Sequence, residues 1–315
     1  MDLSFVVASW NAKDYLSECL KTLTHELSGH GAEIIVVDNG STDGSPEMVG
    51  ERFPHVLLIR NDTNLGFAKA NNIAIRQSTG RYIVLVNSDV KVLEGCIDRM
   101  LSYMDSHSDV GMLGPKILSA DGTVQRSCMG FPTLWNSFSR ALALDVVFPN
   151  SKVFGGKMMT FFHHDKISDV EVVNGCVWMV RREALNEVGL LDEKFFIYAE
   201  DIDWCKRYWV AGWKVVFYPE AEAIHFGSAS SSNNPTRFYL EIYRANLKYW
   251  EKHHGRIAKF CFVLITLIHH ILRLFGQLTL YSIKSSKREQ APMKIKRSVA
   301  CIRLLFFSFT KKRDE

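Results

Sequence analysis

The sequence predicts an α/β protein with a mostly parallel sheet flanked by helices, followed by an amphipathic helical tail. Short apolar strand patterns alternate with helical patterns over the first 120 residues, as in β-α-β crossovers. With 315 residues, 47% of them hydrophobic, the chain can bury a large core. The last part of the chain differs from the rest in charge and in apolar pattern. We therefore predict a domain at residues 1–255 and a tail at 256–315.

The elements of the first part are expected from their hydrophobic periods. Asp14 is the expected N-cap of the first helix. We predict strands at 3–8, 34–37, 56–59, 82–86 and 110–113, and helices at 14–27, 46–53, 67–77 and 95–107. Polar residues follow the first, second and fourth strands, and open sheets of this kind bind ligands beyond the carboxyl ends of their strands.

The second part is less regular at first. Residues 120–170 show no clear period, and we interpret them as an insertion or loop region that contacts the acceptor. Beyond them we predict strands at 170–173, 175–180 and 214–218, helices from 182 and over 236–252, and a strand end followed by a helix within 195–212.

The tail is basic, whereas the rest of the chain is acidic. Residues 1–251 contain 24 Lys and Arg against 31 Asp and Glu, and residues 252–315 contain 14 against 3. Between 260 and 278 the apolar side chains share one helical face and His269, His270 and Arg273 share the other, as in a helix lying in a membrane interface. The apolar face argues against nucleic acid as the partner. The alternative is a core helix that packs on the domain or on a dimer partner.

The cysteines and the N-terminus suggest an intracellular location. None of the seven cysteines forms a CxxC pair, which argues against a disulfide framework or a zinc ribbon and favours a reducing compartment. The first strand pattern begins two residues after Met1 and leaves no room for a signal peptide.

Two acids that end strands are candidate ligand contacts. Asp89 follows an apolar strand in the motif Asn87-Ser88-Asp89, where a carboxylate can hold Mg²⁺ or Mn²⁺ bridging a diphosphate. Asp38 ends the second strand and can accept a hydrogen bond from a base or a ribose. The alternative for both acids is a turn-forming role. The motifs GxGxxG and GxxxxGK[ST] do not occur, so the sequence gives no support for a nicotinamide dinucleotide or P-loop site.

Two further positions are candidates for catalysis. Glu200, Asp201 and Asp203 begin a helix, where one of them can act as a general base; the alternative is simple stabilisation of the helix N-terminus. His225 lies in an apolar segment and can be a neutral imidazole ligand of a metal, or a structural histidine.

Taken together, these segments resemble the family 2 glycosyltransferases, in particular the bacterial rhamnosyltransferase-like branch. The likeness runs from about residue 3 to 252, and the motifs occur in the family's order. The matching segments are VVASWN (6–11), IVVDNGSTDG (35–44), NDTNLGFAKANN (61–72), LVNSD (85–89), GLLDEKFFIYAEDIDWC (189–205), AGWKVV (211–216) and AIH (223–225).

The resemblance implies a Rossmann-like GT-A fold, a nucleotide-diphosphate sugar donor, Mg²⁺ or Mn²⁺, and inversion at the anomeric carbon. It implies that Asp201 is the base, with Glu200 as the lesser candidate, and that Asp89 and His225 hold the metal. The residues implied for the donor are Ser9, Asn11, Asp38, Asn64, Gly66, Asn71 and Asn87. Asn87 departs from the family's DxD motif, because an amide oxygen can bind a cation but adds no charge.

The predicted function is transfer of a sugar to a hydroxyl of a lipid-linked or polysaccharide acceptor in cell-surface glycan synthesis. The resemblance favours dTDP-rhamnose as donor, with a UDP-linked hexose or galactofuranose as the alternative. The tail would hold the enzyme on the cytoplasmic face of the bacterial inner membrane; otherwise the protein is cytoplasmic. A non-catalytic, membrane-associated homologue that binds nucleotide sugar is a further alternative. A sugar nucleotidyltransferase needs a basic signature near the first strand, which residues 9–12 lack.

Overall fold

The strands of the first part form the predicted sheet. The computed structural model describes residues 1–26, 31–227, 235–283 and 291–310. The chain forms two units: unit 1 comprises Met1–Phe131 and Phe162–Asn233, and unit 2 comprises Pro132–Phe161 and Asn234–Glu315. Unit 2 thus includes residues 132–161 of the region interpreted as an insertion, and also residues that precede the predicted boundary at 255.

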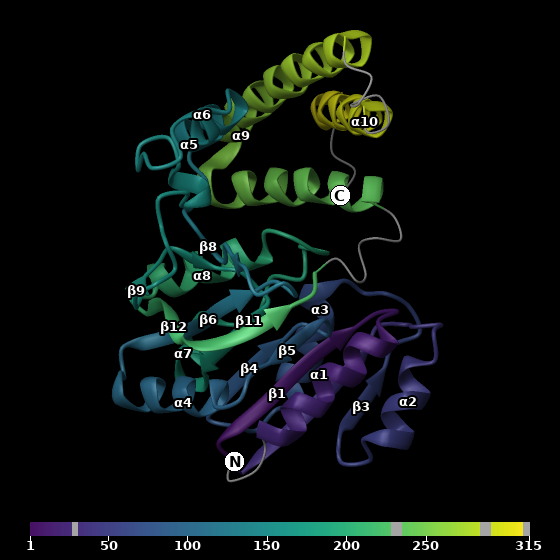
Figure 1. Cartoon of the computed structure of the whole chain (residues 1–315), viewed down its shortest axis with the longest axis vertical. Coiled ribbons are helices and arrows are strands. Elements are labelled where there is room, and N and C mark those ends of the chain that lie inside the picture. The colour runs from purple at the N-terminus through teal and green to yellow at the C-terminus, as the bar shows by residue number, and fades with distance from the viewer. Residues whose placement is uncertain (27–30, 228–234, 284–290, 311–315) are drawn as a thin grey trace. The chain divides into compact units, whose positions relative to one another are not determined.

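Unit 1 contains a mixed sheet (Figure 1). In the described residues its strands run in the order β3-β2-β1-β4-β11-β6-β12-β5. Neighbours from β3 to β4 are parallel, β11 is antiparallel to both β4 and β6, and β12 is parallel to β6. The strands are β1 (Leu3–Ser9), β2 (Ala32–Asp38), β3 (Leu57–Arg60), β4 (Tyr82–Val86), β5 (Val90–Val92), β6 (Val110–Leu118), β11 (Val177–Arg181) and β12 (Lys214–His225).

Four short strands complete the pairing. β7 pairs with β6 and β9 with β12, whereas β8 and β10 form a separate two-stranded sheet. They are β7 (Val124–Gln125), β8 (Cys128–Met129), β9 (Ser168–Asp169) and β10 (Val172–Val173). The helices of unit 1 are α1 (Lys13–Glu26), α2 (Ser45–Arg52), α3 (Phe67–Gln77), α4 (Cys96–Ser106), α7 (Arg182–Val188) and α8 (Glu200–Val210).

The predicted fold class is confirmed, and several details differ. α3 has the predicted bounds, whereas α1 begins at Lys13, so Asp14 lies in its first turn instead of capping it. The predicted strand end before α8 is wrong: Tyr198 and Ala199 have φ of 70° and 61°, which no strand accommodates. β12 continues past the predicted 218 to His225 and pairs there with β5.

Unit 2 is helical. α9 (Pro235–Ile283) changes direction at Gly255, whose φ of 78° is outside the helical range, so it is two helices joined at a bend (Figure 1). Within unit 2, α9 packs against α5 and α10. The remaining elements are α5 (Leu134–Ala141), α6 (Leu144–Val147), the short 3-10 helix η1 (Gly156–Met158) and α10 (Ala291–Thr310). The region predicted to be irregular therefore contributes two α-helices. The predicted tail is helical over its described residues, 256–283 and 291–310, and the rest of it lies outside the described residues.

Among the described residues, the helical span Pro235–Thr279 of α9, which includes the bend at Gly255, is long and apolar enough to cross a bilayer. Its most apolar window has a mean hydropathy of 1.8. This finding depends on length and composition only, and a core helix of a soluble protein passes the same test.

Candidate active site

Asp38 lies at the carboxyl end of β2, directly opposite Ser9 at the end of β1. Both residues are buried. One oxygen of Asp38, Oδ2, accepts a hydrogen bond from the Ser41 backbone at 3.0 Å, whereas Oδ1 and the Ser9 hydroxyl are buried without a partner. Buried polar atoms of this kind are costly unless a ligand satisfies them. The pair therefore suits the N–H and hydroxyl groups of a nucleoside.

Asn11 shapes the loop beside this pair. Its backbone N–H donates to Ser41 Oγ at 2.9 Å, and its Oδ1 accepts from the Thr42 N–H at 2.8 Å. Its φ of 48° lies in the left-handed region, where asparagine is tolerated better than most residues. Asn11 thus ties the turn after β1 to the turn after β2.

Asn39 organises the next loop, and the sequence analysis did not name it as a site residue. Its Nδ2 donates to Asn64 Oδ1 at 3.0 Å, and its Oδ1 accepts from the Leu65 N–H at 3.0 Å. Asn64 Oδ1 also accepts from the Gly66 N–H at 2.9 Å. The Asn64 side chain is therefore occupied in holding the turn before α3.

Gly66 brings the start of α3 against the segment that precedes α8. Its φ is 89°, and a Cβ at this position would lie 2.5 Å from the carbonyl oxygen of Phe196. That oxygen also accepts a hydrogen bond from the Phe67 N–H at 2.7 Å. Only glycine allows this approach. The segment 64–67 therefore joins the turn before α3 to the segment that precedes α8.

Two asparagines on α3 have structural partners. Asn71 is buried and donates to the Phe67 carbonyl at 2.9 Å, and its assignment to the nucleotide pocket stays a prediction. Asn72, which the sequence analysis did not single out, donates to the Leu191 carbonyl at 2.8 Å and accepts from the Leu191 N–H at 3.1 Å. It fixes the segment 189–193 against α3.

Asp89 and His225 meet although 136 positions separate them. Asp89 Oδ1 lies 3.2 Å from His225 Nε2, and the Asp89 carbonyl accepts from the Phe226 N–H at 3.0 Å. On its other side, His225 Nδ1 lies 3.1 Å from Gln125 Oε1 and 3.4 Å from Cys176 Sγ. The pairing of β12 with β5 brings the histidine to this position.

The surroundings of His225 favour its charged form. Burial alone would lower the pKa of His225, but its hydrogen bonds to Asp89 and Cys176 outweigh burial and raise that pKa to about 10. Without a cation, His225 is therefore an imidazolium that faces Asp89.

A divalent cation fits these residues. A carboxylate and an imidazole that face each other are a donor set that Mn²⁺ accepts, and Mg²⁺ accepts the carboxylate. Asn87 is held nearby, since its N–H donates to the Cys176 carbonyl at 3.0 Å. Over the described residues, no group of three or more His, Cys, Asp or Glu side chains is arranged so that it could hold a metal ion. The chain thus offers an incomplete ligand set, to which the oxygens of a diphosphate can be added.

The acids at the start of α8 have three different environments. Glu200 is buried, and this burial, together with the charge of Asp201, raises its pKa well above the ordinary value. Asp203 is fully buried and pairs with Arg207 at 3.0 Å. Asp201 is half-buried, with Oδ1 accepting from the Ile202 N–H at 2.8 Å. Of the three, Asp201 is the acid with solvent access and is best suited to exchange a proton.

The predicted site residues thus form two groups. Ser9, Asp38, Asn64 and Gly66 are linked by the loop contacts described above, and Gly66 in turn contacts the segment before Asp201. Asp89, Asn87 and His225 form the second group, joined through Cys176. That the carboxylates of Asp89 and Asp201 share one pocket stays a prediction.

A Rossmann-like sheet whose strand ends carry such groups is the architecture of the GT-A glycosyltransferases. Two solved structures support this fold. A mannosyltransferase from Pyrobaculum calidifontis in complex with GDP-Man and Mn²⁺ superposes with a TM-score of 0.52 at 15% identity, over 96% of this chain and 86% of that one. S. aureus TarS 1-349 in complex with UDP superposes with a TM-score of 0.50 at 17% identity, over 98% of this chain and 87% of that one.

The sequence comparisons give the family. Residues 4–189 match the family model described as Glycosyl transferase family 2. An N-acetylglucosaminyl-diphospho-decaprenol L-rhamnosyltransferase of Mycobacterium tuberculosis (strain ATCC 25618 / H37Rv) is 31% identical over 248 residues, 74% of this chain and 78% of that protein. The chain belongs to glycosyltransferase family 2, and the resemblance to its rhamnosyltransferase-like members is confirmed.

Proposed function

We propose that this glycosyltransferase transfers rhamnose from dTDP-rhamnose to a sugar hydroxyl of a lipid-diphosphate-linked acceptor, with inversion at the anomeric carbon. The observation that carries the proposal is the identity of 31% with a rhamnosyltransferase whose name specifies an N-acetylglucosaminyl-diphospho-decaprenol acceptor. A UDP-linked hexose or galactofuranose is the alternative donor.

The donor nucleotide would bind at the ends of β1 and β2. The unpartnered Asp38 Oδ1 would accept a hydrogen bond from the base or the ribose of the nucleotide. The neighbouring Ser9 hydroxyl would form a hydrogen bond to the same nucleotide. The loops shaped by Asn11, Asn64 and Gly66 would surround the nucleotide, with Asn71 on α3 behind them.

Asp89 and His225 would hold Mg²⁺ or Mn²⁺, with Asn87 nearby. When bound, the cation neutralises the charge that develops on the diphosphate as it leaves. Asp89 Oδ1 and His225 Nε2 already lie 3.2 Å apart, so little movement of the protein would be needed, although His225 would have to release its proton to the solvent before its Nε2 could bind the cation.

Asp201 would take the proton of the acceptor hydroxyl as its oxygen attacks the anomeric carbon. Its neighbour Glu200 is buried with a raised pKa and is therefore held neutral, which makes it unsuited to act as a nucleophile. One base, with no second carboxylate assigned as a nucleophile, favours a single displacement and hence inversion.

A lipid-linked acceptor requires the enzyme to work at a membrane surface. The described part of unit 2 carries 14 Lys and Arg but only 3 Asp and Glu. Such a charge attracts the anionic lipids of the cytoplasmic leaflet. We therefore place the enzyme as a peripheral protein on the cytoplasmic face of the bacterial inner membrane.

A nucleotide-sugar screen tests the donor and the metal together. dTDP-rhamnose should raise the melting temperature more than UDP-sugars do, and more with Mn²⁺ than with EDTA. Transfer to a synthetic GlcNAc-diphospho-lipid should give a product whose anomeric configuration is opposite to that of the donor by NMR. A retained configuration, or transfer from UDP-sugars alone, would contradict the proposal.

The Asp89→Ala variant isolates the metal site. It should lose the part of donor binding that depends on Mn²⁺ and keep the binding seen in EDTA. Asp98→Ala, which removes an exposed acid on α4, is the matched control and should bind as the wild type does. Equal loss of binding in EDTA would show that Asp89 contacts the nucleotide directly or supports the fold.

A further inference from the structure

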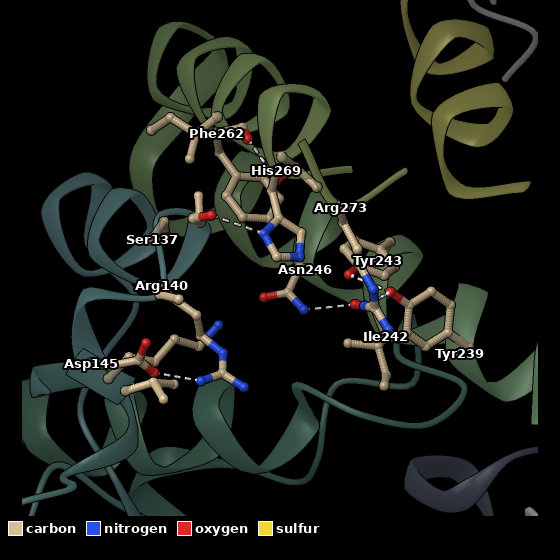
Figure 2. A pocket seen from close by; sticks show the side chains of 16 residues that line it. Ser137, Arg140, Asp145, Tyr239, Ile242, Tyr243, Asn246, Phe262, His269 and Arg273 are labelled. Atoms are coloured by element: carbon tan, nitrogen blue, oxygen red, sulfur yellow. Dashed lines mark hydrogen bonds and ion pairs between the residues drawn. The ribbon is translucent and has the colours of Figure 1, made fainter. Parts of the chain in front are cut away.

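Unit 2 contains a cavity of about 450 Å³ that the catalytic groups do not use (Figure 2). Its walls come from α5, α6 and α9, and all its lining residues belong to unit 2. A hydrogen bond from His269 Nδ1 to the Ala141 carbonyl, at 3.1 Å, joins the two sides. A volume of this size suits a small molecule.

Positively charged side chains predominate in this cavity. Arg140 enters it from α5 and Arg273 from α9, with Asn246 between them (Figure 2), and Lys157 completes the cationic lining. The one lining carboxylate, Asp145, forms an ion pair with Arg140. The cavity therefore keeps an excess of positive charge after internal pairing.

Arg273 has no carboxylate partner among the described residues. The described part of unit 2 contains three acids, and each pairs with another base; the pairs are Asp145 with Arg140, Glu241 with Arg244, and Glu251 with Lys259. Arg273 donates instead to the Tyr239 hydroxyl at 3.0 Å. A guanidinium that lines a cavity and lacks an anion is suited to bind one from solution.

One further polar group in the cavity wall lacks a partner. Asn246 is buried there and donates to the Ile242 carbonyl at 2.6 Å, but its Oδ1 accepts no hydrogen bond. A hydroxyl or N–H group of a ligand would satisfy this oxygen, and anionic oxygens of the same ligand would pair with Arg273.

Apolar side chains next to the cavity are exposed. On α6, Val146 and Val147 are 71% and 63% exposed, and on α9, Leu272 and Phe275, which flank Arg273, are 50% and 66% exposed. Apolar patches beside a charged cavity indicate a ligand with a long apolar part. An isoprenoid diphosphate combines such a chain with four or more anionic or polar oxygens.

We propose that this cavity binds the diphosphate of the lipid-linked acceptor, with Arg273 as its main contact and with the exposed side chains of α6 and α9 beside the isoprenoid chain. This inference rests on the proposed function for the class of acceptor. It assigns recognition of the acceptor diphosphate to residues of unit 2, whereas the donor and metal residues belong to unit 1.

Binding of farnesyl diphosphate to the full-length protein in EDTA tests the assignment. The wild type should bind it more tightly than farnesol or inorganic diphosphate, because only the complete molecule uses both the cations and the apolar surface. Arg273→Gln should weaken farnesyl diphosphate binding by about tenfold or more, as expected for a charge-assisted contact. Lys157→Gln should weaken it less.

Arg303→Gln is the matched control, since it removes one exposed cation of α10, which does not line the cavity. It should bind as the wild type does. Equal affinity of the wild type and Arg273→Gln, equal weakening in Arg303→Gln, or equal binding of farnesol would each overturn the proposal. Melting temperatures of the variants separate loss of binding from loss of folding.

Kinetics separate this inference from the proposed function. With a GlcNAc-diphospho-lipid acceptor, Arg273→Gln should raise KM for the acceptor about tenfold and leave KM for the donor unchanged. If the protein transfers no rhamnose at all, the farnesyl diphosphate result still decides whether the cavity is a diphosphate site.

Discussion

At the scale of single residues, burial decides which acid of the motif Glu200-Asp201-Ile202-Asp203 can do chemistry. Asp203 is paired with Arg207, and burial raises the pKa of Glu200 well above its ordinary value, which leaves Asp201 as the acid with access to solvent. A general base has to be accessible to the acceptor, so Asp201 is the acid that we propose for this role.

The Asp201→Asn variant should therefore lose turnover while donor binding is kept. An amide cannot accept the proton of the acceptor hydroxyl, and loss of a general base costs about 10²–10⁴-fold in rate. Single-turnover transfer and donor titration would measure the two effects separately. Glu187→Gln, which replaces an exposed acid on α7 by its isosteric amide, should leave both unchanged. Near-normal turnover in Asp201→Asn would refute the assignment.

The buried Glu200 predicts a pH-dependent effect on stability. Its pKa is raised in the fold, whereas the unfolded chain releases this proton near pH 4.5. The neutral carboxyl therefore costs nothing below that pH, and the free energy of unfolding falls as the pH rises toward the pKa of the folded state.

Glu200→Gln removes the ionisable group, so the free energy of unfolding of the variant should not fall with rising pH on account of this position. The melting temperature of the variant should exceed that of the wild type by an amount that grows between pH 4.5 and pH 8. A difference that is constant over this range would mean that Glu200 is not held neutral in the fold.

At the scale of elements, α8 is anchored by one arginine. Arg207 pairs with Asp203 and also donates to the carbonyls of Val188 and Leu190 at 2.9 and 2.7 Å. These bonds connect the helix to the turn after α7. The preceding Tyr198 and Ala199 have positive φ, a conformation that costs about 1–3 kcal/mol each. The anchor and the hydrogen bond to Phe67 hold this segment in place.

Arg207→Met should consequently destabilise unit 1 strongly. It removes the cation of a fully buried carboxylate, for which a cost of about 3–5 kcal/mol is typical. Arg76→Met breaks the exposed pair with Glu193 and should cost no more than about 1 kcal/mol. Denaturant unfolding measures both, and similar costs for the two variants would contradict this account of α8.

At the scale of the whole molecule, charge is divided between the two units. Residues 1–251 are acidic overall, and the basic residues concentrate in the last part of the chain, on α9 and α10. This division concentrates any attraction to an anionic surface on one unit.

Full-length protein should bind phosphatidylglycerol vesicles, bind phosphatidylcholine vesicles far less, and dissociate as salt is raised. Replacing the exposed Lys296 and Arg303 by Gln should weaken vesicle binding about tenfold or more. Removing two exposed charges from unit 1, with Arg52→Gln and Arg60→Gln, should have little effect. Equal effects of the two double variants in a sedimentation assay would argue against a membrane-facing unit 2.

Most of the fold could be predicted from the sequence where the signals are local. The helix at 67–77 and the strands from β1 to β4 follow from hydrophobic period, and the motifs around Asp38, Asp89 and Asp201 identified the family. These features depend on residues that are close together in the chain, so neither long-range pairing nor packing is needed to recognise them.

Other features arise only when distant segments meet. The contact of Asp89 with His225, the support of that histidine by Gln125 and Cys176, and the approach of Gly66 to Phe196 each join segments at least 49 positions apart. The sequence by itself determined most of the elements in the first 118 residues and the family to which the chain belongs. Tertiary structure alone decided which acid is buried, which arginine lacks a carboxylate partner among the described residues, and which helices enclose a cavity, because burial and pairing are properties of neighbours in space.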